Sequence, residues 1–291
     1  MASLDMSPAE IQLLKASAKT LQRRGPEIAT RMYENLFTAV PDVKVFFSTA
    51  FLEKQVDEDG KTQTTLMGKI MAHILFQFCM NIENLDRFKD DCERVSAKHV
   101  SRGIKPEFYP FYGDALILAL KQVMGDEATD QTLAAWRKAY DRIASMFIAT
   151  EKRMTAEVRD QIGGWEGFRT FRVAERVEEA DVTSLATDDS DDEYEETETR
   201  TVFTLEPVDG NKTLPVHKLG QYVCIRYKMD GVTSHRNYTL QSITDNKMVL
   251  AIKHADETPT SKYMIEKWQK GFEVETSPPV GTFLLMETLS V

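Results

Sequence analysis

The residue best suited to metal chemistry in this sequence is His99. Cys92, Val95 and His99 are spaced three and four apart, so a helix places them on one face. A turn through Gly103 follows, and Pro106 suits the first turn of the next helix, where no backbone donor is needed. An imidazole held between two such boundaries can act as a fixed ligand to a haem iron. The alternative is a histidine that only packs in the core or at the surface, which is commoner for a single histidine on a helix.

Composition limits the classes of function. The 291 residues are 42% hydrophobic and 28% charged, as in an ordinary globular protein, and they exceed what one core usually supports, so we expect two domains. The net charge of −10 argues against nucleic acid or an anionic membrane as a partner. Three cysteines without metal-site spacing are expected to be free thiols in a reducing compartment. Because the sequence has no apolar signal core and no run of membrane-spanning length, we expect a cytoplasmic protein.

The first half of the chain has helical periodicity. Ser7, Pro8 and Glu10 form a capping box that begins the first helix. Apolar residues then recur at helical spacing without a heptad repeat, except over residues 51–62, which are polar and predicted to form a loop. The pattern predicts a globular all-α domain, which either encloses a planar cofactor or serves only for interaction.

The character of the sequence changes at Gly163. Alternating and β-branched segments follow, separated by turn-forming residues, and they predict an antiparallel barrel with one helix over 260–269. The expected strands cover residues 168–177, 201–206, 221–227, 236–243, 247–253 and 272–275. The tract from Asp188 to Thr199 contains eight acidic residues and no basic one, so we expect a disordered loop there.

Taken in order, several segments resemble flavohaemoglobins. In the first half these are GPEIATRMYENLFTAVPDVKVFF (25–47), NIENL (81–85), KHVSRGIKPEFY (98–109), WRKAYDRIASMFIATE (136–151) and GGWEGF (163–168). In the second half they are LEPVDG (205–210), GQYV (220–223), RNYT (236–239) and PPVGTF (278–283).

The resemblance implies a multidomain chain, α then β, with haem b and FAD as cofactors. An all-α globin-like domain would cover residues 1–158. An antiparallel β-barrel of the ferredoxin-reductase FAD-binding type would cover residues 159–291, with an acidic disordered insert at about 186–200.

The resemblance also implies roles around the haem. His99 matches the proximal ligand to the iron, and Tyr109 and Glu151 match the tyrosine and glutamate that hydrogen-bond around it. An acceptor on the imidazole N–H makes the ligand more electron-donating, which favours oxygen activation over storage. Tyr33 matches the distal tyrosine that donates to oxygen at the haem, and Phe47 matches the ring packed on the haem face. Without the resemblance, Tyr109 and Glu151 would only tie two helices together.

Other residues match the family's flavin site. Arg236, Tyr238 and Thr239 match an R-x-Y-S/T signature, in which the arginine meets the pyrophosphate, the ring lies along the isoalloxazine and the hydroxyl bonds near N5. Strand alternation places Arg236 and Tyr238 on one face. The remaining matches are Lys98 at the flavin edge, Tyr222 near the adenine side and Ser261 at a phosphate-binding helix start.

The sequence departs from the family at three places. Where the family usually has a distal glutamine, ungapped alignment places Met67, with Met71 one turn on, and Gln63 reaches the pocket only if the helix shifts by a turn. Before Ser261, the family's glycines are replaced by residues 257–260, so fewer backbone amides can hold phosphate. The sequence also ends where the family's NAD-binding domain would begin and has no glycine-rich dinucleotide fingerprint, so we expect no NAD(P)H binding of the family's kind.

These matches predict an oxidoreductase, a haem-dependent nitric oxide dioxygenase that converts NO and O2 to nitrate. Oxygen would bind at the haem, electrons would arrive through FAD, and a separate NAD(P)H-dependent reductase would act in trans. The alternative is a non-enzymatic haem protein, either an oxygen or redox sensor or an oxygen-binding globin with a vestigial barrel.

Overall fold

The computed structural model describes residues 6–56, 60, 63–185, 194–229, 231–254 and 258–281. The chain forms two compact units, one of Met1–His99 with Ile104–Arg153, the other of Val100–Gly103 with Met154–Val291. The first is helical and the second contains a closed barrel, so the predicted order of α then β is confirmed. The expected boundary between residues 158 and 159 lies inside a helix that continues to Asp160.

The helical unit begins as the capping box predicts. The Ser7 hydroxyl accepts from the Glu10 N–H, and the Glu10 carboxylate accepts from the Ser7 N–H at 2.6 Å. The α-helices are α1 (Pro8–Ala16), α2 (Ala18–Ala39), α3 (Thr49–Leu52), α4 (Leu66–Met80), α5 (Lys89–Arg102), α6 (Tyr109–Met124) and α7 (Asp130–Asp160). Short 3-10 helices join them: η1 (Pro41–Phe46), η2 (Leu85–Phe88), η3 (Pro106–Phe108) and η4 (Gly125–Glu127). Across the described part of the chain, no helix combines the length and apolarity needed to cross a bilayer.

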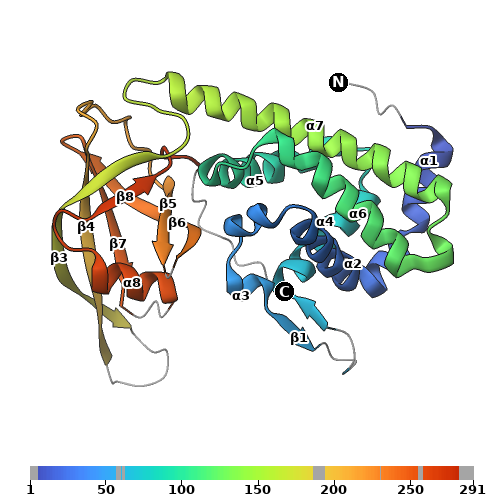
Figure 1. The fold of residues 1–291 in the computed structure, drawn as a ribbon, viewed down its shortest axis with the longest axis horizontal. Coiled ribbons are helices and arrows are strands. Elements are labelled where there is room, and N and C mark those ends of the chain that lie inside the picture. The colour runs from blue at the N-terminus through green and yellow to red at the C-terminus, as the bar shows by residue number, and fades with distance from the viewer. Residues whose placement is uncertain are drawn as a thin grey trace. The chain divides into compact units, whose positions relative to one another are not determined.

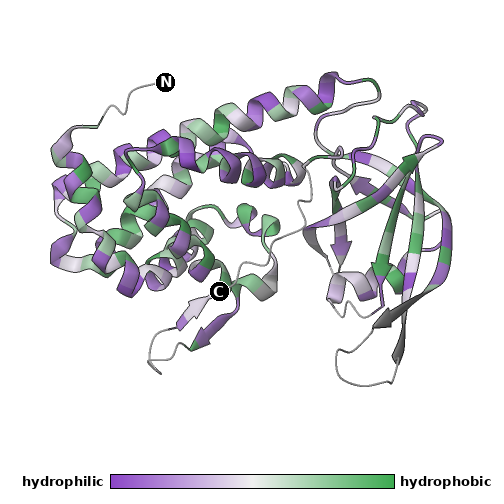
Figure 2. Ribbon diagram, turned by 180° about the vertical axis from the view of Figure 1, so that it is seen from behind, coloured by the Kyte–Doolittle hydropathy of each residue, from purple (hydrophilic) through white to green (hydrophobic). Residues whose placement is uncertain are grey.

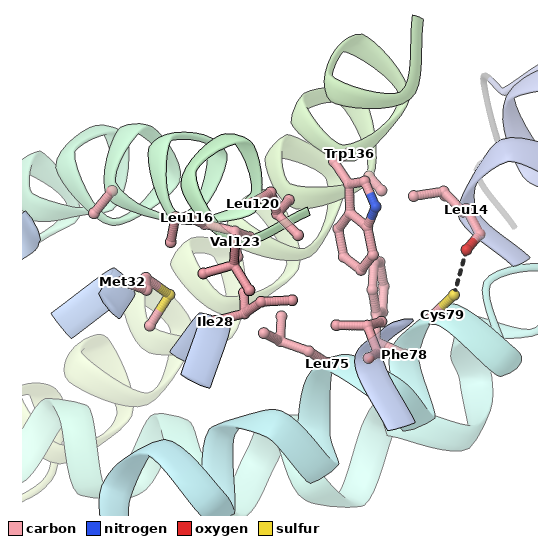
Figure 3. Packing of buried hydrophobic residues seen from close by; sticks show 14 of the residues in the cluster. Leu14, Ile28, Met32, Leu75, Phe78, Cys79, Leu116, Leu120, Val123 and Trp136 are labelled. Atoms are coloured by element: carbon pink, nitrogen blue, oxygen red, sulfur yellow. Dashed lines mark hydrogen bonds between the residues drawn. The ribbon is translucent and has the colours of Figure 1, made fainter. Parts of the chain in front are cut away.

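The core of this unit forms where α2 packs against α4 and α6. Leu14, Ile28, Leu120 and Trp136 come from four different helices, are at most 2% exposed and gather in one cluster (Figure 3). The Trp136 indole N–H donates to the Ser17 hydroxyl at 3.1 Å, so its polar atom is satisfied within the core. Hydrophobic and hydrophilic residues are interspersed along the helices, as expected for amphipathic elements around one core (Figure 2).

The loop predicted over residues 51–62 is wrong in part. α3 continues to Leu52, and β1 (Lys54–Val56) pairs antiparallel with β2 (Gln63–Thr65). Tertiary contacts hold this hairpin, because the Thr65 N–H donates to the Thr30 hydroxyl of α2 at 3.1 Å while the Thr65 hydroxyl caps α4. Residues 57–59 and 61–62 lie outside the described residues.

The second unit is a closed antiparallel barrel (Figure 1). Its strands are β3 (Arg169–Leu185), β4 (Tyr194–Pro207), β5 (Tyr222–Met229), β6 (Val232–Thr244), β7 (Lys247–Lys253) and β8 (Glu273–Thr276), in the order β3-β4-β7-β6-β5-β8. Asp245 and Asn246 join β6 to β7 with φ of 50° and 57°, a left-handed pair suited to a tight hairpin turn. Alternate strand residues fill the interior. The helix predicted over residues 260–269 is observed as α8 (Pro259–Lys267).

The acidic insert expected to be disordered at about 186–200 is partly strand. β4 begins at Tyr194, and its register with β3 runs without a break from Leu185↔Tyr194 to Glu179↔Arg200. The backbone ladder extends the β3–β4 hairpin beyond the residues that pair with β7, and this pairing supplies the hydrogen bonds that composition alone does not predict. Residues 186–193 lie outside the described residues.

Candidate functional site

The end of α5 fixes the backbone of His99. The Ile104 N–H donates to the His99 carbonyl at 3.0 Å, and the Gly103 N–H donates to the Val100 carbonyl at 3.2 Å. Gly103 has a φ of +72°, so these bonds form a Schellman motif with glycine in the left-handed position. The predicted turn at Gly103 is therefore a helix cap that holds the last turn carrying His99.

Three side chains from three helices meet at the His99 ring. His99 Nδ1 lies 2.7 Å from Glu151 Oε1 and 3.1 Å from the Tyr109 hydroxyl. The Tyr109 hydroxyl donates to Glu151 Oε1 at 2.5 Å. Because this carboxylate oxygen is the common acceptor, the His99 proton lies on Nδ1 and Nε2 keeps its lone pair for a metal. The structure thus brings together the three residues predicted for the proximal side.

Burial sets the protonation of this network. Burial, and then the charge of Glu151, raises the pKa of Tyr109 well above its ordinary value, so the phenol remains a donor. Glu151 is 5% exposed, and its second oxygen, Oε2, is buried without a hydrogen-bond partner among the described residues. A buried carboxylate polarises the imidazole N–H, which fits an imidazole that donates electron density to a bound metal.

Tyr140 is a contributor that sequence reasoning did not single out. Its hydroxyl donates to the Tyr109 carbonyl at 2.7 Å. Tyr140 and Glu151 lie eleven residues apart on α7, about three turns, so one helix face holds Tyr109 by both its backbone and its hydroxyl. Phe147, one turn before Glu151, packs its ring 5.8 Å from the His99 ring. The helical periodicity of α7, which places Tyr140 on the same face as Glu151, is the sequence signal that could have identified it.

The predicted distal residues lie in or against the same helical core. The ring of Tyr33 lies 5.3 Å from that of Phe47, and both contact Phe37. Burial raises the pKa of Tyr33 well above its ordinary value, so its hydroxyl is a donor. Met67 and Met71 are half-buried against this core.

Gln63 does not belong to the distal cluster in this structure. It lies on β2, paired with Val56, and its side chain is exposed. Met67, in the first turn of α4, is therefore the better distal candidate of the two. A thioether donates no hydrogen bond, whereas the Tyr33 hydroxyl can.

The predicted flavin residues of β6 are placed as strand alternation requires. Arg236 and Tyr238 pair with Ile225 and Val223, whose side chains are fully buried. Tyr238 packs against the barrel core, and Arg236 Nη1 donates to the His235 carbonyl at 2.9 Å. A guanidinium such as that of Arg236 can meet a phosphate group at short range.

The other predicted flavin residues differ in their accessibility. Thr239 and Lys98 are exposed, and Lys98 directly precedes His99 on α5. Tyr222 lies against the backbone of Gly281, where an added Cβ would come within 2.5 Å of the ring. Residues 278–281 of PPVGTF and the GQYV segment are therefore adjacent at the first residue of β5, where Tyr222 also bridges to Val280.

Ser261 lies in the first turn of α8, where it is hydrogen-bonded to the N-cap residue. It is fully buried, and its hydroxyl accepts from the Thr258 hydroxyl at 3.0 Å. The Ser261 N–H donates to Thr258 Oγ1 at 3.3 Å, so Thr258 is the N-cap of α8. Pro259, in the first turn, has no N–H. Two positions at the α8 start thus offer no free N–H, because Pro259 has none and Thr258 accepts from that of Ser261, so the start is a weak fit to a phosphate.

Comparison with known proteins agrees with this architecture. Residues 30–147 match the Globin family. The chain is 32% identical over 278 residues to a flavohemoprotein of Bacillus subtilis, covering 94% of this chain and 62% of that protein. It is 30% identical over 286 residues to a flavohemoprotein of Pseudomonas aeruginosa, covering 97% of this chain and 65% of that protein.

A solved structure shares the fold. The flavohemoglobin of Malassezia yamatoensis, determined with bound FAD and heme, aligns with a TM-score of 0.74 at 22% identity, over 95% of this chain and 65% of that one. The chain thus spans 62% to 65% of the length of these relatives.

Proposed function

Since the chain contains a globin domain and is homologous to flavohemoproteins over nearly its whole length, we propose that it is a haem-dependent nitric oxide dioxygenase. His99 would hold haem b through Nε2, and the barrel would hold FAD. The observation that carries the proposal is the His99–Glu151–Tyr109 network, in which Glu151 and Tyr109 are buried. The haem, when bound, supplies the redox chemistry that joins O2 to NO to give nitrate.

The chain's residues then have distinct tasks on the proximal side. Glu151 Oε1 accepts the Nδ1 proton of His99 and keeps the imidazole in one tautomer and one orientation. Tyr109 donates to the same oxygen and holds the carboxylate in place. This charge-assisted arrangement favours oxygen activation over reversible storage, since it increases electron donation by the ligand.

On the distal side, the chain contributes the hydroxyl of Tyr33 and the aromatic rings of Phe37 and Phe47. Tyr33 is 4% exposed, and because burial raises the pKa of its phenol, the hydroxyl keeps its proton and can donate to a ligand. Phe47 and Phe37 pack around it and exclude water.

Support for FAD is uneven across the barrel. The relative from Malassezia yamatoensis binds FAD, and Arg236 and Tyr238 lie on one strand face here. The α8 start, with Ser261 buried behind its Thr258 cap, offers little to the pyrophosphate. We propose that Arg236 supplies most of the phosphate attraction, which predicts weaker flavin binding than haem binding.

O2 and NO are the proposed small-molecule ligands, and a separate NAD(P)H-dependent reductase is the proposed electron donor. Protein supplied with haem and FAD should consume many equivalents of NO aerobically with a chemical or enzymatic reductant, and nitrate should be the product. Tyr33→Phe should slow this reaction while leaving the haem content unchanged. Consumption of a single equivalent of NO, with no turnover under any reductant, would refute the assignment.

The second candidate is an oxygen-binding or sensing globin with a vestigial barrel. Two observations favour this alternative. Met67 stands in place of a distal donor, and the start of α8 is a weak fit to a phosphate because Thr258 accepts from the Ser261 N–H. The discriminating measurement is the flavin-to-haem ratio of protein supplied with both. A ratio near one supports the dioxygenase, and haem without flavin supports the globin alternative.

A further inference from the structure

Strand β6 presents two faces with different neighbours. Arg236 and Tyr238 share the face of the buried β5 residues opposite them. By alternation, His235 and Asn237 belong to the other face. There they meet Val100–Gly103, the end of α5, which groups with the barrel unit although α5 begins in the helical unit.

Three hydrogen bonds join His235 and Asn237 to the end of α5. The His235 Nδ1–H donates to the Arg102 carbonyl at 3.1 Å. The Asn237 amide donates to the Ser101 hydroxyl at 3.1 Å and accepts from Arg102 Nε at 3.4 Å. Ser101 is fully buried and His235 is 5% exposed, so these bonds form largely out of water, where they are strong and costly to lose.

The Arg102 carbonyl is one of the groups that a helix cannot satisfy for itself. The last four carbonyls of an α-helix lack partners within the helix. Here the Schellman bonds satisfy His99 and Val100, and His235 satisfies Arg102. The strand residue therefore adds a partner to the cap of the helix that carries the metal-ligand candidate.

The surroundings of His235 require a neutral donor. Burial, then the charge of Arg226, lowers the pKa of His235 to about 4, and Arg102 and Arg236 add positive charge nearby. The carboxylate of Glu275 pairs with Arg226 at 2.5 Å. A cationic side chain at position 235 would face three guanidinium groups, whereas a neutral imidazole donates to Arg102 without that repulsion.

We propose that His235 and Asn237 are positioning residues for His99: by holding the last turn of α5, they fix the direction in which the imidazole presents Nε2. The consequence for the metal rests on the proposed function, but the anchoring of α5 does not.

The test uses the full chain, supplied with haem and FAD, in three forms. His235→Leu removes the donor at similar bulk, and His235→Asn keeps an N–H close to the position of Nδ1. Amide hydrogen exchange at Gly103 and Ile104 should be about tenfold faster in His235→Leu, as expected for one lost buried bond. It should return toward the unmodified rate in His235→Asn, while α2 amides should exchange unchanged in both.

The haem midpoint potential is the second readout, because a purely local structural role would not move it. It should change in His235→Leu and be restored in His235→Asn. Unchanged exchange at Gly103 and Ile104, or changed exchange with an unmoved potential, would overturn the positioning role. Where His235→Leu does not fold, Asn237→Leu replaces it. An unmodified chain that binds no haem would refute the proposed function, whereas the exchange rates would still decide the anchoring.

Discussion

Glu151→Gln tests the network that carries the proposed function. The carboxylate accepts from His99 at 2.7 Å and from Tyr109 at 2.5 Å, and both bonds are charge-assisted. Glutamine keeps an acceptor oxygen but loses the charge. Hydrogen bonds to charged groups contribute about 1.5–3 kcal/mol against about 0.5–1.5 kcal/mol for neutral ones. From the middles of these ranges, the change removes about 1.3 kcal/mol of interaction with the imidazole N–H.

That interaction favours the more highly charged ferric state, because an electron-rich imidazole stabilises it. If the whole difference acts on the redox equilibrium, about 1.3 kcal/mol corresponds to a rise of about 55 mV in the one-electron midpoint potential. Spectroelectrochemical titration of the haem-loaded protein measures it. Glu157→Gln is the control, since it removes the same charge from an exposed position on α7.

A second effect of Glu151→Gln concerns stability. The new amide nitrogen would replace Oε2, which is buried and lacks a partner among the described residues. An unsatisfied buried donor costs about 1–3 kcal/mol, so the melting temperature should fall more in Glu151→Gln than in Glu157→Gln. A midpoint potential that stays level or falls in Glu151→Gln would refute the reasoning.

The remaining predictions concern stability. Leu120→Ala, at a fully buried position of α6, should lower the free energy of unfolding by about 2–5 kcal/mol in urea titrations, while Leu118→Ala, 46% exposed on the same helix, should change it little. Gly163→Ala should lower the melting temperature, because Gly163 has a φ of +75° and a Cβ there would lie 2.5 Å from the Leu214 backbone; an unchanged melting temperature would contradict this. Finally, the folded pKa of His235 is about 4 against 6.5. The unfolded chain therefore takes up a proton first, and stability should fall by up to about 3 kcal/mol as the pH drops from 6.5 toward 4. His235→Asn should remove this part of the pH dependence in denaturant titrations at each pH.

Local sequence signals located most elements of the fold. The Ser7 capping box begins α1, the Asp245–Asn246 turn joins β6 to β7, and alternation places Arg236 and Tyr238 together. These features depend on residues a few positions apart, so the sequence carries them directly. The roles of His99, Tyr109 and Glu151 came from the resemblance to flavohaemoglobins, and the structure brings these three side chains into contact.

Only the tertiary structure decided the contacts between distant residues. Periodicity does not reveal three of these pairings. They are the β3–β4 ladder at Tyr194–Arg200, the hydrogen bond from the Thr258 hydroxyl to that of Ser261, and the bond from His235 to the Arg102 carbonyl. A buried polar group must find a partner, but which partner it finds depends on how the elements pack. The sequence thus determined most of the helices and strands and indicated which side chains could carry chemistry. Packing determined the Tyr194–Arg200 ladder and which of those side chains meet.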